Sequence, residues 1–215
     1  MSKKLRIGGA SGFWGDSVIA TPQLLNGNDL DFIVYDYLAE ITMSIMARAR
    51  AKDATKGYAV DFVSSVLKLN LRQIADQKVK ILSNAGGVNP EACAEAIREL
   101  IKELKLDLKV SVVLGDDLMN EKNKFSELNT KEMYSNEDFP AEDKIASINA
   151  YLGAFPIAEA LKSGADIVIT GRSVDSAVTL GACIYAFGWN EKEYDKLAAG
   201  SLAGHIIECG TQSTG

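Results

Sequence analysis

Histidine and cysteine are scarce in this sequence of 215 residues, and both shortages limit the chemistry that it can perform. There is one histidine, His205, and there are three cysteines, Cys93, Cys183 and Cys209. An odd number of cysteines without metal-ligand spacing argues against a disulfide framework and against a structural zinc site. We therefore expect a reduced, cytoplasmic protein that holds no metal and has few options for acid–base catalysis by imidazole.

Long apolar runs and an excess of positive charge are also missing. The most apolar region, residues 165–189, is interrupted by Asp166, Arg172 and Asp175, so it lacks the run of about 18 apolar residues that a membrane span needs. The first residues lack the apolar core of a secretory signal. Lys and Arg number 23 against 29 Asp and Glu, a net charge of −6, and no basic block offers a face for nucleic acid. The sequence thus predicts neither a membrane nor a nucleic acid as partner.

The sequence does contain an alternation of short apolar runs with longer helical stretches. With 47% apolar and 24% charged residues it has the composition of a globular protein, and its length suits a single domain over 1–215. Continuously apolar runs, typical of strands buried on both faces, occupy 5–8, 31–35, 79–82, 109–114 and 166–170. Helical spacing covers 40–52, 58–73, 91–105, 148–162 and 197–208. This order predicts a doubly wound α/β fold, a mostly parallel sheet with helices on both faces in a Rossmann-like three-layer sandwich.

Residues 116–143 interrupt this alternation. The segment is rich in Asn, Glu, Lys and Asp, and it follows the fourth predicted strand directly. A connection of this length inside a domain is usually a lid, an interface arm or a disordered segment. We expect a long polar insertion or lid beside the edge of the sheet where ligands bind.

The turns that follow the five predicted strands hold the candidate site residues, because ligands of open parallel sheets bind outside the carboxyl ends of the strands. Each of these turns carries glycine or charge. The candidates for substrate binding are Gly9, Ser11, Gly12, Asp36, Asn84, Gly86, Gly87, Asp116 and Arg172. Arg172 lies beside a helix N-terminus, which favours a carboxylate or phosphate, although Asp175 could simply pair with Arg172 or cap that helix.

The glycine-rich turn after the first strand leaves a nicotinamide cofactor open as an alternative. Its glycines would let backbone N–H groups approach an anion, but their spacing is not the dinucleotide fingerprint, and they could equally serve a tight turn. Asp36 stands where Rossmann proteins hold a ribose-binding acid, or it caps the next helix. The segment NAGG at 84–87 is similar to one in short-chain dehydrogenases, but no tyrosine is followed four residues later by lysine, so their catalytic pair is missing.

The last predicted helix places three reactive side chains on one face. His205, Glu208 and Cys209 are spaced i, i+3 and i+4. A Cys–His pair could serve acid–base or nucleophilic chemistry, whereas the plainer interpretation is a hydrogen-bonded histidine beside a buried thiol. His205 and Glu208 alone are too few ligands for a zinc site. The candidate catalytic residues are His205, Glu208, Asp175 and Cys209.

Five motifs together resemble one known family, the acyclic terpene utilisation family. The motifs are IGGASGFWGD (7–16), SNAGGVNP (83–90), YLGAFPIAEA (151–160), VITGRSVDSA (168–177) and LAAGSLAGHIIECG (197–210). They span nearly the whole chain and resemble the N-terminal domain of that family, once classed as a domain of unknown function. The resemblance also favours a functional role for the face formed by His205, Glu208 and Cys209, because that segment is a hallmark of the family.

The resemblance implies a domain of a metabolic enzyme that acts on branched-chain or acyclic terpenoid carboxylic acids or on their CoA thioesters, with the reaction type open. No cofactor is implied, and the CoA thioester is a possible substrate. The resemblance implies that relatives continue beyond the Cys-Gly motif into a larger C-terminal remainder. Either a second chain supplies that half or the sequence is part of a longer chain, and we expect a homo- or hetero-oligomer. Two alternatives stay open. One is a non-catalytic assembly subunit of an acyl-CoA-processing complex, and the other is an NAD(P)-dependent oxidoreductase.

Overall fold

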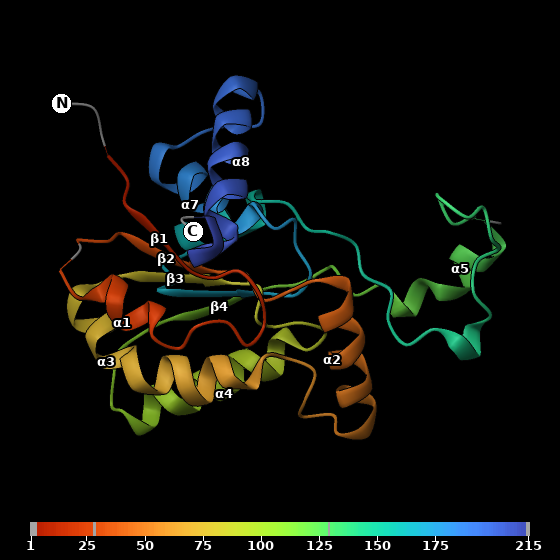
Figure 1. Ribbon diagram of the computed structural model, residues 1–215, viewed down its shortest axis with the longest axis horizontal. Coiled ribbons are helices and arrows are strands. Elements are labelled where there is room, and N and C mark those ends of the chain that lie inside the picture. Colours follow the sequence, from red (N-terminus) through yellow and green to blue (C-terminus); the bar gives the residue numbers. More distant parts are fainter. Residues whose placement is uncertain (1–3, 28, 129, 214–215) are drawn as a thin grey trace.

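Five short parallel strands form the centre of the fold in a computed structural model, which describes residues 4–27, 29–128 and 130–213 (Figure 1). The strands are β1 (Ile7–Ser11), β2 (Phe32–Tyr35), β3 (Lys80–Ser83), β4 (Val110–Val113) and β5 (Ile167–Thr170). Their order in the sheet is β1-β2-β3-β5-β4. The five predicted strands are confirmed, except that the first begins and ends later than its apolar run suggested.

Helices cover both faces of the sheet, as predicted (Figure 1). Alternate residues of each strand point to opposite faces, so Ile33 and Tyr35 of β2 join one core cluster while Phe32 and Val34 join the other. The first cluster includes residues of α1 (Ala20–Leu25), α2 (Glu40–Lys52), α3 (Lys68–Gln77) and α4 (Pro90–Glu103). The second packs α6 (Phe155–Lys162), α7 (Ala177–Phe187) and α8 (Tyr194–Glu208) against the sheet. The doubly wound α/β class is therefore confirmed.

Two predicted helices differ from the structure at their ends. The helix expected over 58–73 is a π-helical turn (Phe62–Leu67) that runs directly into α3. The helix expected over 148–162 begins only at Phe155, because residues before it are extended: the Leu118 N–H donates to the Ile148 carbonyl at 2.8 Å, and the Ala150 N–H donates to the Asp116 carbonyl at 2.8 Å. Long-range pairing therefore overrides the local helical spacing in this segment. Among the described residues, no helix combines the length and apolarity needed to cross a bilayer.

The insertion after β4 projects from the sheet as a separate arm (Figure 1). The arm, residues 116–150, contains α5 (Lys122–Glu127) and two 3₁₀ turns, Met119–Glu121 and Glu142–Lys144. Its two ends pair with each other next to the carboxyl end of β4. The arm thus lies at the edge of the sheet that the sequence assigned to the ligand, and its return segment faces α2 across the cavity described below.

The strand order creates a switch point between β3 and β5. The connection after β3 leads to α4 on one face of the sheet, and the connection after β5 leads to α7 on the other. Neighbouring strands whose connections diverge in this way leave a crevice at their carboxyl ends, which is where α/β proteins bind ligands. Asn84 follows β3 and Arg172 follows β5, so both lie at this crevice.

Candidate functional site

Asp36 and Asn84 form a buried polar pair at the carboxyl ends of β2 and β3. Asn84 is fully buried; its Oδ1 accepts the Tyr37 N–H at 2.8 Å, and its Nδ2 donates to Asp36 Oδ1 at 2.6 Å. The Leu38 N–H donates to the same oxygen at 3.2 Å. Because these donors fix one carboxyl oxygen, Asn84 sets the orientation of the Asp36 side chain.

Burial and neighbouring carboxylates make Asp36 a weak acid. Desolvation is the main cause that raises its pKa to about 7, and the Asp175 charge and a hydrogen bond with the carboxyl of Glu208 raise it further against the opposing effect of Asn84. Carboxylates this close to one another would repel, which favours the protonated form of Asp36. A buried carboxyl group that exchanges its proton near neutral pH is suited to general acid–base catalysis.

Asp175 completes a cluster of three carboxyl groups from distant parts of the chain. One oxygen each of Asp36, Asp175 and Glu208 lie within 4.8 Å of one another. Oxygen ligands of this kind suit a hard divalent cation such as Mg²⁺. Part of the negative charge is already balanced, because Arg172 Nη1 donates to Asp175 Oδ1 at 2.8 Å. The donor set therefore fits either a cation or a bound proton.

Arg172 connects this carboxyl cluster to the surface of α2. Its side chain is only 4% exposed, and Nη1 donates to the Leu38 carbonyl at 3.1 Å as well as to Asp175. Its guanidinium lies 4.0 Å from the centre of the Tyr151 ring, and Nη2 is 3.7 Å from Glu40 Oε1. Burial alone would lower the pKa of Arg172, but Tyr151 and Asp175 outweigh it and the pKa is raised. The guanidinium is therefore a fixed positive charge.

Asp116 holds the turn that carries Arg172. Its Oδ2 accepts hydrogen bonds from the Arg172 N–H at 2.8 Å and from the Asn149 side-chain amide at 2.9 Å. Asp116 is buried, with 2% of its surface exposed. Burial raises its pKa against the effect of these hydrogen bonds. Gly171 is required here because a Cβ on it would lie 2.5 Å from Asp116 Oδ1. The sequence placed Asp116 in the site as a substrate ligand, and the structure shows its carboxyl joining the arm to the Arg172 turn.

The buried position of Asp116 predicts that its replacement destabilises the protein more than replacement of the adjacent Asp117. Asp116→Ala should lower the free energy of unfolding by about 2 kcal/mol or more, because the Arg172 N–H and the Asn149 amide would lose their acceptor. Asp117→Ala is the control. Its ion pair with Arg50 and the hydrogen bond that it accepts from the Met119 N–H are both exposed and should together contribute about 1 kcal/mol or less. Urea unfolding of both variants measures the difference; equal losses would contradict the role of Asp116 in holding the turn.

The glycines of the first turn are packed against the end of α8. A Cβ on Gly9 would lie 2.5 Å from the Ile207 carbonyl oxygen, and one on Gly12 would lie 2.6 Å from that of Cys209. Ser11 is buried and its Oγ donates to the Phe13 carbonyl at 2.9 Å. Backbone of α8 and of the turn after it therefore packs directly against Gly9 and Gly12, which leaves no room for a side chain at either position.

Gly86 and Gly87 meet protein atoms in the same way. A Cβ on Gly86 would lie 2.6 Å from the Pro90 Cβ, and one on Gly87 would lie 2.7 Å from the Gly57 carbonyl oxygen. Gly87 also has φ +55°, a conformation that disfavours other residues. Close packing accounts for both glycines without a ligand.

The residues predicted to share one face of α8 lie in different environments: His205 faces solvent, and Glu208 lies in the carboxyl cluster. The His205 side chain is 75% exposed and its Nδ1 lies 2.9 Å from Glu208 Oε1, while the Glu208 side chain is 11% exposed. The pKa of the Cys209 thiol is raised, by partial burial first and then by the charges of Glu208, Asp36 and Asp175. A thiol that resists ionisation is a poor nucleophile. Of the three residues, Glu208 is the one that joins the carboxyl cluster.

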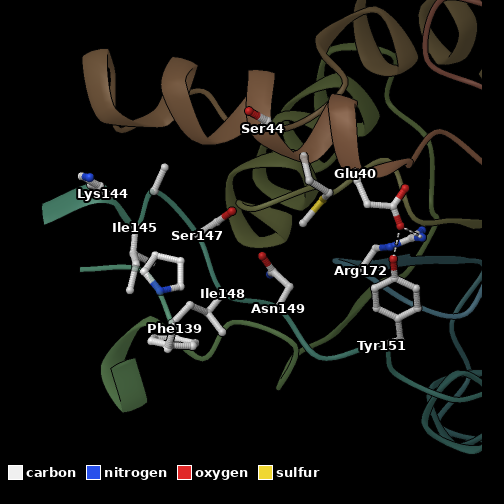
Figure 2. Close-up of a pocket in the computed structure, with 13 residues that line it drawn as sticks. Glu40, Ser44, Phe139, Lys144, Ile145, Ser147, Ile148, Asn149, Tyr151 and Arg172 are labelled. Atoms are coloured by element: carbon white, nitrogen blue, oxygen red, sulfur yellow. Dashed lines mark hydrogen bonds and ion pairs between the residues drawn. The ribbon is translucent and has the colours of Figure 1, made fainter. Parts of the chain in front are cut away.

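A cavity of about 460 Å³ lies between α2 and the return segment of the arm (Figure 2). Arg172, Tyr151 and Glu40 close one end, and Lys144 lies near the other. The side chains between the ends are mainly apolar: Met43, Phe139, Pro140, Ile145 and Ile148. A volume of this size, with apolar walls and a few polar groups, is typical of small-molecule sites.

Sequence reasoning missed Glu40 and Tyr151. The Tyr151 hydroxyl donates to Glu40 Oε1, although the two residues are far apart in the chain. Glu40 was interpreted as the start of a helix, and Tyr151 as a residue within one. The available signal was the motif at 151–160, which marks Tyr151 but gives no partner for it.

Comparison with known proteins identifies the family of this chain. No curated protein and no solved structure matches the chain. One family model matches residues 5–215 and is described as acyclic terpene utilisation family protein AtuA. Because the match covers nearly all of the sequence and agrees with the five motifs, the chain belongs to the AtuA family of acyclic terpene utilisation.

Proposed function

We propose that this chain carries the acid–base site of an enzyme that acts on a branched-chain or acyclic terpenoid carboxylic acid or on its CoA thioester. Family membership links the chain to acyclic terpene utilisation. The observation that carries the proposal is the position of Arg172, which contacts Asp175 of the carboxyl cluster on one side and Tyr151 and Glu40 of the cavity on the other. The proton-exchanging groups and the apolar cavity thus adjoin the same guanidinium.

In this proposal the cavity binds the apolar chain of the substrate and the carboxyl cluster exchanges a proton with it. Asp36 is the preferred general acid or base, because its pKa of about 7 lets it gain and lose a proton near neutral pH. Glu208 lies beside Asp36 in the carboxyl cluster, and Asn84 orients the Asp36 carboxyl. His205, which is mostly exposed, can relay protons between Glu208 and solvent. Asp175 holds Arg172 in place.

Ligand binding and proton exchange test the proposal separately. A bound acid or thioester at about 100 times its Kd adds ~2.7 kcal/mol of stability, which for a chain of this size raises the Tm by roughly 5–10 °C. Incubation of the same ligands in D₂O should then give deuterium at the carbon next to the carboxyl or thioester carbonyl, detected by NMR. Asp36→Asn should reduce this exchange by about 10²–10⁴-fold while the Tm shift persists.

An exposed aspartate provides the control for this experiment. Asp76 lies on α3, on the surface, so Asp76→Asn should leave both the Tm shift and the exchange rate unchanged. Exchange that is equally fast in wild type and Asp36→Asn would contradict acid–base catalysis by Asp36. No Tm shift with any acid or thioester would contradict the substrate class.

The arm favours partner binding as a second candidate function. It projects from the sheet (Figure 1). Its exposed large apolar side chains include Leu128, Met133 and Tyr134. Exposed apolar groups gathered on a projecting segment are typical of contact sites for another chain. An assembly role predicts a stable oligomer or hetero-complex by analytical ultracentrifugation, which deletion of the arm would abolish. A monomer that catalyses the exchange described above would contradict it.

A further inference from the structure

The inner end of the cavity is built to hold a carboxylate. Two donors converge on Glu40 Oε1: the Tyr151 hydroxyl, which donates a hydrogen bond to it, and Arg172 Nη2, which lies at 3.7 Å. The Arg172 side chain is 4% exposed, so the fold holds its guanidinium in position. Tyr151 is half exposed, and its ring is positioned by the stacked guanidinium (Figure 2). A buried guanidinium with an adjacent phenol is a preorganised anion site.

Glu40 itself is not part of the buried framework. Its side chain is 81% exposed, and it belongs to the first residue of α2, beside the cavity. The Tyr151 hydrogen bond is the main cause that lowers the pKa of Glu40, so the carboxylate form is the one held there. An exposed side chain can turn away into water at small cost, whereas Arg172 and Tyr151 would remain and offer their donors to another anion.

We propose that Glu40 occupies the position of a ligand carboxylate and competes with it for Tyr151 and Arg172. The ligand is a small amphipathic carboxylic acid whose carboxylate replaces that of Glu40, while its apolar chain lies along Met43 and Ile148. The inference rests on the proposed function and makes it specific: this cavity selects the free acid. A CoA thioester has no anionic oxygen at its carbonyl, so it would gain nothing from the loss of Glu40.

The cavity has a cation at each end, so an acid could bind in two orientations. Lys144 lies at the far end from Arg172, and its ammonium forms no ion pair with any residue that the structure describes (Figure 2). The apolar residues Phe139, Ile145 and Ile148 separate the two cations. The buried guanidinium of Arg172 already has the Glu40 carboxylate beside it. The ammonium of Lys144 is exposed, so water can solvate its charge without a carboxylate. The proposal places the carboxylate at the Arg172 end, where the protein already holds one, and the Tyr151 and Glu40 variants below test this orientation.

Removal of the Glu40 charge should strengthen the binding of acids and of no other ligand. By isothermal titration calorimetry, Glu40→Gln should bind citronellic acid about tenfold or more tightly than wild type, the gain expected for one charge-assisted hydrogen bond. Citronellol, which has the same chain without the carboxylate, should bind both proteins equally, and so should citronellyl-CoA. Glu91→Gln is the matched control, because Glu91 is an exposed glutamate in the first turn of α4 and lies outside the residues that line the cavity.

The outcomes separate this inference from the proposed function. Equal or weaker binding of citronellic acid by Glu40→Gln, with clear binding by wild type, overturns the competition by Glu40 and leaves the proposed substrate class standing. Tighter binding of octanoate by Glu40→Gln without binding of any branched acid supports the carboxylate subsite and overturns the substrate class. Binding of neither acid by either protein overturns both. Tyr151→Phe should weaken acid binding in the Glu40→Gln background, which confirms the location of the carboxylate.

Discussion

Asp36→Asn is expected to make the protein more stable than wild type above pH 7 and to flatten the pH dependence of its stability. The folded state raises the pKa of Asp36 from the ordinary value of 3.8 to about 7, so it binds the proton more tightly than the unfolded chain does. The stabilisation that this proton provides is complete below pH ~4 and is lost as the pH rises through about 7. A difference of about three pKa units corresponds to roughly 4 kcal/mol.

Asparagine is a close replacement for the protonated form of Asp36. Its Oδ1 can still accept from Asn84 Nδ2 and from the Leu38 N–H, and its own amide can donate toward Glu208 in place of the proton. The variant therefore keeps the hydrogen bonds of the cluster but has no proton to lose. Any change in pH dependence then reports the proton that Asp36 binds in the folded protein.

Urea unfolding between pH 4 and pH 8.5 measures this effect. The free energy of unfolding of wild type minus that of Asp36→Asn should fall by up to about 4 kcal/mol across this range. Asp76→Asn, on the exposed face of α3, should give a difference close to zero at every pH. Parallel curves for wild type and Asp36→Asn would show that Asp36 is ionised in the folded protein throughout and would remove it as a proton carrier.

Magnesium in the same experiment distinguishes a bound proton from a bound cation. Three carboxyl oxygens within 4.8 Å could ligate Mg²⁺, which would require Asp36 to be ionised. A cation that binds only the folded state raises its stability by mass action. The bound-proton interpretation predicts that millimolar Mg²⁺ leaves the stability of wild type unchanged at pH 7. Stabilisation of wild type but not of Asp36→Asn would instead assign the cluster to a metal.

The sheet-edge part of this site could be predicted from the sequence because the rule behind it is simple. Parallel strands bring their carboxyl ends to one edge, so Asp36, Asn84 and Arg172 were candidates as soon as the strands were recognised. The structure places all three at that edge. Glu208 came from a different signal, its spacing from His205 in the last helix, and only the return of α8 to β1 brings it to Asp36.

The cavity could not be predicted from the sequence, because its walls come from long-range pairing. Residues 148–150 have helical spacing, yet their backbone pairs with residues 116–118 at the base of the arm. This pairing brings Tyr151 next to Glu40, a contact that no local sequence pattern predicts. The glycines of the first turn show a second long-range effect: the backbone of α8 packs against them, which no local pattern indicates. Their contact with a ligand stays a prediction. Sequence patterns thus predict which residues lie at the edge of the sheet, whereas the cavity beside them depends on tertiary contacts.

Arg172→Ala is the second change with a large expected effect, because one side chain contacts both halves of the site. The variant should lose about 2–3 kcal/mol of stability: the Leu38 carbonyl and the Asp175 carboxylate lose a donor, and Tyr151 loses the stacked guanidinium. The Asp175 side chain is 42% exposed, so water recovers part of that loss. Binding of citronellic acid should weaken by about 100-fold or more, since the carboxylate would keep only the Tyr151 hydroxyl.

Arg172→Lys separates the loss of charge from the loss of geometry. A lysine ammonium keeps the charge but cannot reach Asp175, the Leu38 carbonyl and the Glu40 position together, as the planar guanidinium does. We therefore expect acid binding by Arg172→Lys to lie between that of wild type and Arg172→Ala. Arg48→Ala, an exposed arginine on α2, should leave stability and binding unchanged. Calorimetry should be run at a temperature where urea unfolding shows every variant folded. If folded Arg172→Ala bound the acid as tightly as wild type, the guanidinium would serve only to hold the fold, and the carboxylate would have to bind elsewhere in the cavity.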